Sequence, residues 1–147
     1  MTIRKIGIDD SQIRIRFRSE LLPQSADNHA DESADFVAGS SMDIEEVFVV
    51  ENDDGKVVGF IELNTREFAE GSRHPLVPYV EAWFVEKRHR HRGHGRKLME
   101  AAENWARRNG FTELASDAEI TNTRSIELHK ALGFEETERI VCFLKRF

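Results

Sequence analysis

One short segment of the sequence places two glycines between a strand-like run and an amphipathic helix pattern. Residues 90–95 read Arg-His-Arg-Gly-His-Gly and match R-x-x-G-x-G, after the apolar run 79–85 and before a helical pattern that begins near Arg96. Glycines allow a tight turn, successive N–H groups can then form an anion-binding nest, and the N-terminal end of a helix attracts negative charge. The segment therefore predicts a strand-turn-helix unit that can hold a pyrophosphate. The same letters also fit a solvated basic loop, so the surrounding sequence has to be considered.

The length and composition indicate one domain over residues 1–147. A chain of 147 residues can bury roughly two-thirds of its unfolded surface without disulfides. Cys142 is the only cysteine, which excludes an intrachain disulfide. The N-terminus lacks a basic-then-apolar signal pattern, and no apolar run approaches membrane-spanning length. We therefore expect a soluble cytoplasmic protein without membrane attachment.

Charge is distributed unevenly along a chain whose net charge is -6. Residues 20–54 hold eleven acidic side chains and no lysine or arginine, whereas residues 87–97 hold six lysines and arginines and no acid. Such a separation would let one domain attract a cationic and an anionic ligand to different places. The acidic segment also fits a solubilising face.

Strand-like and helix-like segments alternate along the chain, which predicts an α/β or α+β layer fold. A hairpin is predicted where Asn52-Asp53-Asp54-Gly55 joins two β-branched runs, and the segment from Asn64 to Pro78 is predicted to be a long loop. A helix with Ile13, Phe17 and Leu21 at helical spacing is expected between a cap at Asp9 or Asp10 and Pro23. The other expected helices are 30–38, 96–108 and 122–132, and the expected strands are 2–6, 47–50, 56–63, 79–85, 112–116 and 137–145.

This order of elements, with R-x-x-G-x-G after the fourth strand and Gly133-Phe134 near the C-terminus, resembles the GNAT superfamily of N-acetyltransferases over nearly the whole chain. The resemblance implies a central mixed, mostly antiparallel sheet with splayed fourth and fifth strands, flanked by about four helices. It also implies acetyl-coenzyme A as co-substrate, with its pyrophosphate on the R-x-x-G-x-G backbone and its pantetheine arm along the fourth strand. The co-substrate-binding residues so implied are Phe84, Val85, Arg90, His91, Arg92, Gly93, His94, Gly95, Arg96, Asn122 and Ser125.

Several segments are similar to aminoglycoside 6′-N-acetyltransferases. They are Glu67-Phe68, Gly71, Val80 to Val85, Ser116-Asp117-Ala118, Asn122, Ser125, His129, 131–134 and 136–139. The likeness implies acetyl transfer to the 6′-amine of an aminoglycoside by a homodimer, with a polyamine or a protein amine as alternative acceptors. Two residues depart from the pattern: Leu22 stands where a tryptophan is frequent, and Phe68 where a tyrosine is usual. The residues expected on the acceptor side are Leu22, Phe68, Tyr79, Glu81 and Asp117.

Acetyl transfer to an amine requires a proton acceptor, because an alkylamine is mostly protonated at neutral pH. Glu81 is the leading candidate, since strand alternation would place it on one face with Tyr79, Trp83 and Val85. Asp117 would assist it or hold a second ammonium group. Both carboxylates also fit structural roles: an ion pair or a backbone contact for Glu81, and a helix cap or turn for Asp117.

The remaining chemical roles fall on the fourth strand and the last helix. A backbone N–H near Phe84 or Val85 could donate to the oxygen that becomes negative during the reaction. His129 stands where many relatives carry a tyrosine that donates to the departing sulfur, and Asn122, Ser125 and His129 share one helix face. A packed histidine and a helix N-cap are the structural alternatives for His129 and Asn122.

Other functions are less consistent with the sequence. His89, His91 and His94 lie close together, but metal sites usually include orienting carboxylates and the neighbouring cations would repel a dication, so we expect no metal. The basic segment could neutralise phosphates of a nucleic acid, but it is short and the chain is acidic, so we expect none. A GNAT-like module that binds coenzyme A without turnover is a third alternative.

Overall fold

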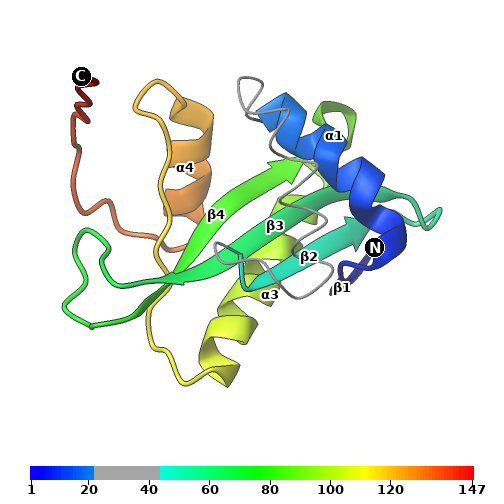
Figure 1. Ribbon diagram of the computed structural model, residues 1–147. Coiled ribbons are helices and arrows are strands. Elements are labelled where there is room, and N and C mark those ends of the chain that lie inside the picture. The colour runs from blue at the N-terminus through cyan, green and yellow to red at the C-terminus, as the bar shows by residue number, and fades with distance from the viewer. Residues whose placement is uncertain (22–43) are drawn as a thin grey trace.

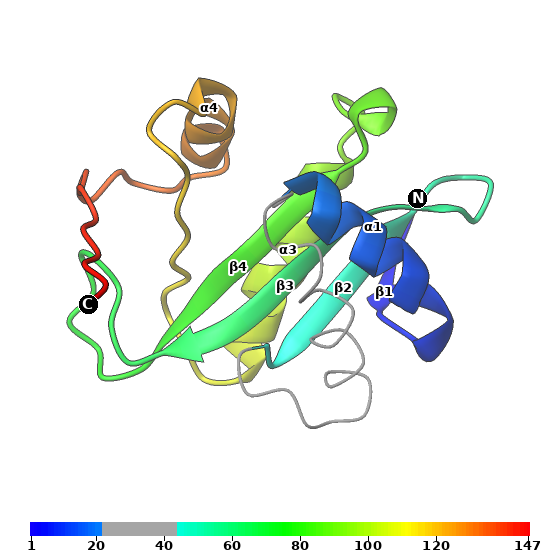
Figure 2. The same ribbon diagram turned by 45° about the horizontal axis from the view of Figure 1, so that its top comes forward.

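The computed structural model describes residues 1–21 and 44–147. Four strands form one antiparallel sheet in the order β1-β2-β3-β4, with α1 on one face and α3 on the other (Figures 1 and 2). Within these described ranges, no helix combines the length and hydropathy needed for a membrane span. The elements are β1 (Thr2–Lys5), η1 (Ile8–Asp10), α1 (Ser11–Leu21), β2 (Glu46–Glu51), β3 (Val57–Arg66), β4 (Val77–Val85), η3 (Lys87–His89), α3 (His94–Arg108) and α4 (Thr123–Ala131).

The predicted hairpin is confirmed as β2 and β3, which pair antiparallel with Phe48 opposite Ile61. Its turn uses the chemistry of the sequence: the Asn52 side-chain oxygen accepts hydrogen bonds of 3.0 Å from the backbone N–H groups of Asp54 and Lys56. Gly55 has φ 78°, a conformation that costs a glycine little. Local turn residues therefore set the register of the centre of the sheet.

Apolar side chains on both faces of the sheet form the core, which explains why the strands read as continuous apolar runs. On the α3 face, the predicted helical stripe is confirmed, because Leu98, Ala102 and Trp105 are buried. On the α1 face, the rings of Phe17, Phe60 and Phe84 lie with centroids 5.2 to 6.4 Å apart. The two helices thus fix the sheet from opposite sides.

A bulge interrupts β4 at Glu81. Leu63 pairs with Val80 and Glu62 pairs with Ala82, so Glu81 is an additional residue on β4. Such a bulge breaks the two-residue alternation of side chains and re-aims the extra residue. Val80, and not Glu81, therefore packs with Trp83 and Val85 in the α3-side cluster. The expectation that Glu81 shares a face with Trp83 and Val85 is wrong for this reason.

The predicted fifth strand, 112–116, is reduced to one parallel bridge between Tyr79 and Ala115. Two hydrogen bonds of 2.9 Å hold it, from Val80 N–H to the Ala115 carbonyl and from Ala115 N–H to the Pro78 carbonyl. Beyond this bridge the chain turns away to α4, which stands apart from the sheet in both views (Figures 1 and 2). The splayed arrangement expected from the family is therefore present.

The expected last strand, 137–145, is not formed. These residues have no regular secondary structure, and Val141 and Phe143 are 78% and 92% exposed. The alternating pattern alone does not make a strand, because a strand needs a neighbour to satisfy its backbone groups.

Two other elements differ from expectation in their boundaries. Asn64–Arg66 extend β3 and pair with Val77–Tyr79, so the long loop is shortened to residues 67–76. The helix α3 begins at His94, two residues before the predicted start. The expected helix 30–38 lies outside the described residues.

Candidate functional site

The segment 90–95 has the backbone shape of an anion-binding nest. His91 has φ 63° and Gly93 has φ 85°, two left-handed residues within one short turn. Gly93 is the N-cap of α3, and the Lys97 N–H is bonded to its carbonyl at 3.0 Å. Because the first N–H groups of a helix precede this first intrahelical bond, those of residues 94–96 are available to an anion. The residues present therefore fit a pyrophosphate group.

The two glycines of the motif have different surroundings. Gly93 provides the left-handed turn. Gly95 lies where α3 packs on β4, and a Cβ atom at this position would make an ordinary van der Waals contact of 3.4 Å with Trp83 Cζ2. The indole Nε1 of Trp83 donates to the Gly95 carbonyl at 3.1 Å. The spacing R-x-x-G-x-G thus joins a turn to a helix–strand contact.

The basic side chains around the nest are not equivalent. Arg92 and Arg96 are exposed. Arg90 turns inward, where its Nε donates to the Val85 carbonyl at 2.7 Å and burial lowers the pKa of its guanidinium group. The His94 ring is also buried, with Nδ1 2.9 Å from the His89 carbonyl oxygen, so only its backbone faces the nest. The sequence reasoning missed Arg124, whose Nη2 lies 3.2 Å from His91 Nε2.

A cleft lies between β4 and α4 and reaches the nest. Of the residues predicted to bind the co-substrate, its lining contains Phe84, Val85, Arg90, His91, Gly95, Asn122 and Ser125. The lining also includes Leu21, Trp83, Arg124 and Leu128. Glu86 N–H donates to the Val58 carbonyl at 2.9 Å, toward β3. Because consecutive N–H groups of a strand point to opposite sides, the N–H of Val85 faces the open edge. Two backbone N–H groups were predicted to donate to the oxygen that becomes negative. That of Val85 is oriented for this role, and that of Phe84 points toward β3 instead.

The start of α4 supplies one wall of this cleft. Asn122 is the N-cap of α4, and its side-chain oxygen accepts from the Ser125 N–H at 3.2 Å. The structural alternative for Asn122 is thus confirmed, although the residue also lines the cleft. The spacing of residues in the sequence could not distinguish the N-cap role of Asn122 from a role in co-substrate binding.

Both ring nitrogens of His129 are engaged. Nδ1 lies 2.7 Å from the Ser125 carbonyl oxygen, which can only accept, so Nδ1 carries the hydrogen. Nε2 lies 2.7 Å from Ser116 Oγ, and in the neutral ring it accepts a hydrogen bond from this hydroxyl. Trp83 and Phe134 pack edge-on against the ring, each with centroids 5.2 Å apart. This arrangement forms a Ser-His pair that the sequence did not predict.

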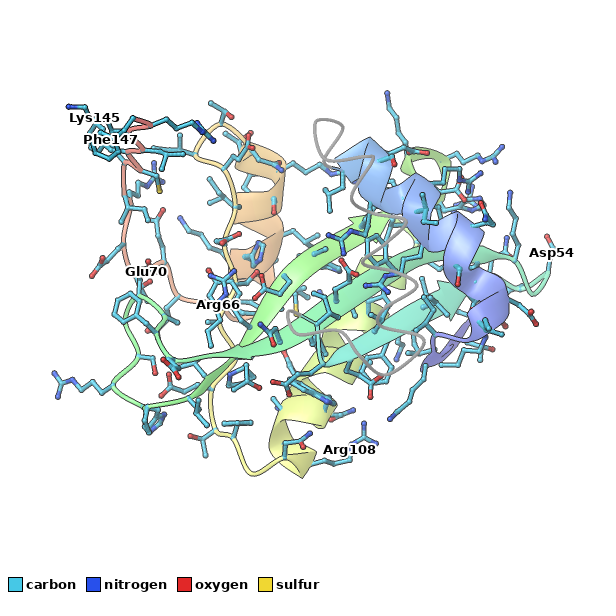
Figure 3. All side chains as sticks on the ribbon, in the orientation of Figure 1. Asp54, Arg66, Glu70, Arg108, Lys145 and Phe147 are labelled. Carbon is cyan, nitrogen blue, oxygen red and sulfur yellow. The ribbon has the colours of Figure 1, made fainter. Side chains whose placement is uncertain are left out.

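The two predicted carboxylates lie around Tyr79. The Tyr79 hydroxyl donates to Asp117 Oδ2 at 2.8 Å, and burial together with this hydrogen bond raises the pKa of Tyr79. Glu81 accepts two hydrogen bonds from Arg66, of 2.7 Å from Nε and 2.6 Å from Nη2. The Arg66 guanidinium also lies over the Tyr79 ring, 3.6 Å from its centroid. Figure 3 labels Arg66 on the ribbon. The sequence reasoning did not select Arg66.

The remaining predicted positions are less central. Phe68 lies on the loop 67–76 and is 68% exposed. Leu22 lies outside the described residues. The rings of His89 and His94 have centroids 6.3 Å apart, and residues 1–21 and 44–147 contain no group of three or more potential ligands that could hold a metal ion.

Comparison with known proteins places this arrangement in a family. Residues 14–134 match the acetyltransferase (GNAT) family. Aminoglycoside N(6′)-acetyltransferase type 1 of Klebsiella aerogenes is 37% identical over 144 residues, which cover 97% of this chain and 95% of that protein. The enzyme of the same name from Stenotrophomonas maltophilia is 35% identical over 97% of this chain and 91% of its own length.

Solved structures agree with the sequence comparison. AAC(6′)-Iy in complex with the bisubstrate analogue CoA-S-monomethyl-acetylneamine superposes with a TM-score of 0.88 at 30% identity, covering 99% of this chain and 98% of that chain. The 6′-N-acetyltransferase AAC(6′)-Ih of Acinetobacter baumannii gives a TM-score of 0.87 at 29% identity, over 99% of this chain and 98% of its own. The nest, the splayed edge of β4 and these similarities show that the chain belongs to the GNAT acetyltransferase family.

Proposed function

We propose that this protein transfers the acetyl group of acetyl-coenzyme A to a primary amine of a polycationic small molecule, the 6′-amine of an aminoglycoside. The observation that carries the proposal is the position of the cleft along β4. The nest at residues 90–95 lies beyond the C-terminal end of β4, Glu81 is at the middle of this strand, and Asp117 is bonded to Tyr79 in its N-terminal half. A long anionic donor and a cationic acceptor can therefore meet beside one strand, and the similar aminoglycoside acetyltransferases support this pairing.

Acetyl-coenzyme A supplies the acetyl group as a thioester, and side chains on and around β4 supply the proton transfers. In the proposal, Glu81 or Asp117 takes a proton from the acceptor ammonium, directly or through water. The Val85 N–H donates to the oxygen on which negative charge develops. His129 and Ser116 form the proton path for the departing sulfur: a protonated Nε2 donates to Ser116 Oγ, whose own hydrogen is then free to be donated.

A thiol-release assay with acetyl-coenzyme A tests the proposal. The acceptors compared are several aminoglycosides, linear polyamines and short lysine peptides. The expected result is a preference for aminoglycosides, with acetylation at the 6′-amine identified by mass spectrometry and NMR. A preference for polyamines or peptides would transfer the proposal to those acceptors, and absence of turnover with every amine would overturn it.

Thermal stabilisation separates the proposed enzyme from the two other classes of protein. Acetyl-coenzyme A should raise the melting temperature, because it binds only the folded state. Duplex DNA of equal charge should not. A protein stabilised by acetyl-coenzyme A but inactive with every amine would be a coenzyme-A-binding module.

We further propose that the protein is a cytoplasmic homodimer. In this dimer, residues 137–145 of each copy pair as a strand with the segment 112–116 of the other copy. Four large apolar side chains of this arm are at least 60% exposed, and so is Phe147 just after it; the four are Ile140, Val141, Phe143 and Leu144. Lys145 and Phe147 lie far from the sheet (Figure 3). Exposed large apolar side chains that are close together often mark an interaction surface. The extended segment 112–116, which has one bridge to β4, lines an open cleft of about 520 Å³. A strand from a second copy satisfies both features by β-addition.

Light scattering after size exclusion tests the dimer. The double substitution Val141→Lys with Phe143→Lys places two charges on one face of the arm and should give a monomer. Glu138→Lys changes the net charge by the same amount on the same arm and should leave the dimer intact. A wild-type protein that elutes as a monomer at all concentrations would contradict the pairing.

A further inference from the structure

The contacts of Arg66 are those that an ammonium group of a substrate would make. Its guanidinium donates to both carboxylate oxygens of Glu81 and covers the face of Tyr79 at 3.6 Å. A carboxylate and an aromatic face are the two protein groups that attract an organic cation most strongly. The protein therefore carries a cation of its own inside the acceptor region.

The arrangement also determines which of the two carboxylates, Glu81 or Asp117, is open to an ammonium group of the substrate. Tyr79 links the two carboxylates, because its ring contacts Arg66 and its hydroxyl donates to Asp117. Glu81 directs both oxygens to Arg66, so the guanidinium competes with an incoming amine for this carboxylate while the fork is closed. Asp117 is exposed and accepts one hydrogen bond from Tyr79, which leaves lone pairs for a ligand.

We infer that Arg66 is a specificity-determining residue, an internal cation that a polycationic acceptor displaces from Glu81 and from the face of Tyr79. The inference deepens the proposed function and rests on it. Asp117 attracts one ammonium group, and a second one exchanges with the guanidinium. A monocation lacks the second group and leaves the fork closed, so Glu81 is released from Arg66 only by an acceptor with several charges.

The position of Arg66 makes this exchange feasible. Its side chain is 41% exposed, whereas that of Glu81 is 18% exposed. The guanidinium can therefore move into water and be hydrated, while the carboxylate stays in place. Arg66 is the last residue of β3, next to the loop 67–76, so its movement does not require the central sheet to open.

Steady-state kinetics of Arg66→Ala test the inference, with Arg108→Ala as the control. Arg108 is an exposed arginine at the end of α3, and its removal changes the net charge equally (Figure 3). Arg66→Ala should lower KM for a polycationic aminoglycoside about tenfold, the value of one charge-assisted hydrogen bond that no longer has a competitor. A monoamine fragment of the same sugar should show no comparable gain, and Arg108→Ala should resemble the wild type.

Inhibition by guanidinium chloride at non-denaturing millimolar concentration provides a second measurement. This inhibition would not change in Arg66→Ala if Arg66 had only a structural role. In Arg66→Ala the free guanidinium ion should refill the vacated position and inhibit competitively against the aminoglycoside. The wild type and Arg108→Ala should be nearly insensitive. Arg66→Gln, which keeps the size but not the charge, serves if the alanine variant does not fold, and Arg66→Lys should keep a KM near that of the wild type.

Two results would overturn the inference: an equal rise of KM for all acceptors in Arg66→Ala, or no competition by guanidinium. Either would make Arg66 a structural partner of Glu81. If the wild type acetylates no amine, the proposed function fails separately. Calorimetric titration of spermine into the wild type and Arg66→Ala then tests the exchange alone, with tighter binding expected in the variant.

Discussion

Glu62→Gln should be one of the most destabilising conservative substitutions in this protein. Glu62 lies opposite the β4 bulge, and its side chain is 1% exposed. Its Oε2 accepts from Arg14 Nε at 2.8 Å and from Arg18 Nη1 at 3.1 Å, and Arg14 Nη2 donates to the same oxygen. The side chains of Arg14 and Arg18 are 0% and 11% exposed. Glu62 thus pairs with two guanidinium groups of α1, which also take part in other interactions.

The magnitude follows from the burial of all three groups. Replacing one member of a buried ion pair costs about 3–5 kcal/mol, because the buried partner loses a charge that offsets its own desolvation. For a chain of this length, each kcal/mol lowers the melting temperature by about 3 °C, so the expected loss is roughly 10–15 °C. Circular dichroism at increasing temperature measures it.

Glu46→Gln is the matched control for this substitution. Glu46 pairs with Lys5, whose side chain is 69% exposed, and such a pair contributes at most about 1 kcal/mol. If Glu62→Gln lowers the melting temperature no more than Glu46→Gln does, the reasoning about the buried charges is refuted.

Three further substitutions test the site and the acid stability. Glu81→Ala should lower kcat at least about a hundredfold, the usual effect of a lost general base, while stabilisation by acetyl-coenzyme A is kept; equal loss of both would indicate a structural role. Gly93→Asp should weaken acetyl-coenzyme A binding more than Gly93→Ala does, because both strain the left-handed φ of 85° but only aspartate adds charge in the nest; normal affinity in the aspartate variant would misplace the nest. Hydrogen bonds from Arg4 hold the pKa of Asp10 below its ordinary 3.8, so its contribution is present above that pH and lost as the pH falls through the lowered pKa. Asp10→Asn should therefore be less stable at neutral pH but lose less stability on acidification, which melting curves from pH 7 downward will show.

Much of the fold was predictable because its signals are local. The hairpin at Asn52-Gly55, the helical stripe ending at Trp105 and the nest around Gly93 each depend on residues within a few positions of one another. Backbone sterics and hydrophobic periodicity act at this range. The segments 112–116 and 137–145 have strand-like sequences, but their structure depends on a partner strand that periodicity does not identify.

By itself, the sequence determined the strand-turn-helix unit with two glycines, the two-sided apolar sheet and the supply of carboxylates for a cationic acceptor. Only the tertiary structure decided how these carboxylates are used. The bulge in β4 turns Glu81 toward Arg66, a residue 15 positions earlier in the sequence, and the bridge at Tyr79 brings in Asp117, 38 positions later. These contacts join elements that are distant along the chain, and pairing between strands, with its register and its bulge, determines which side chains meet.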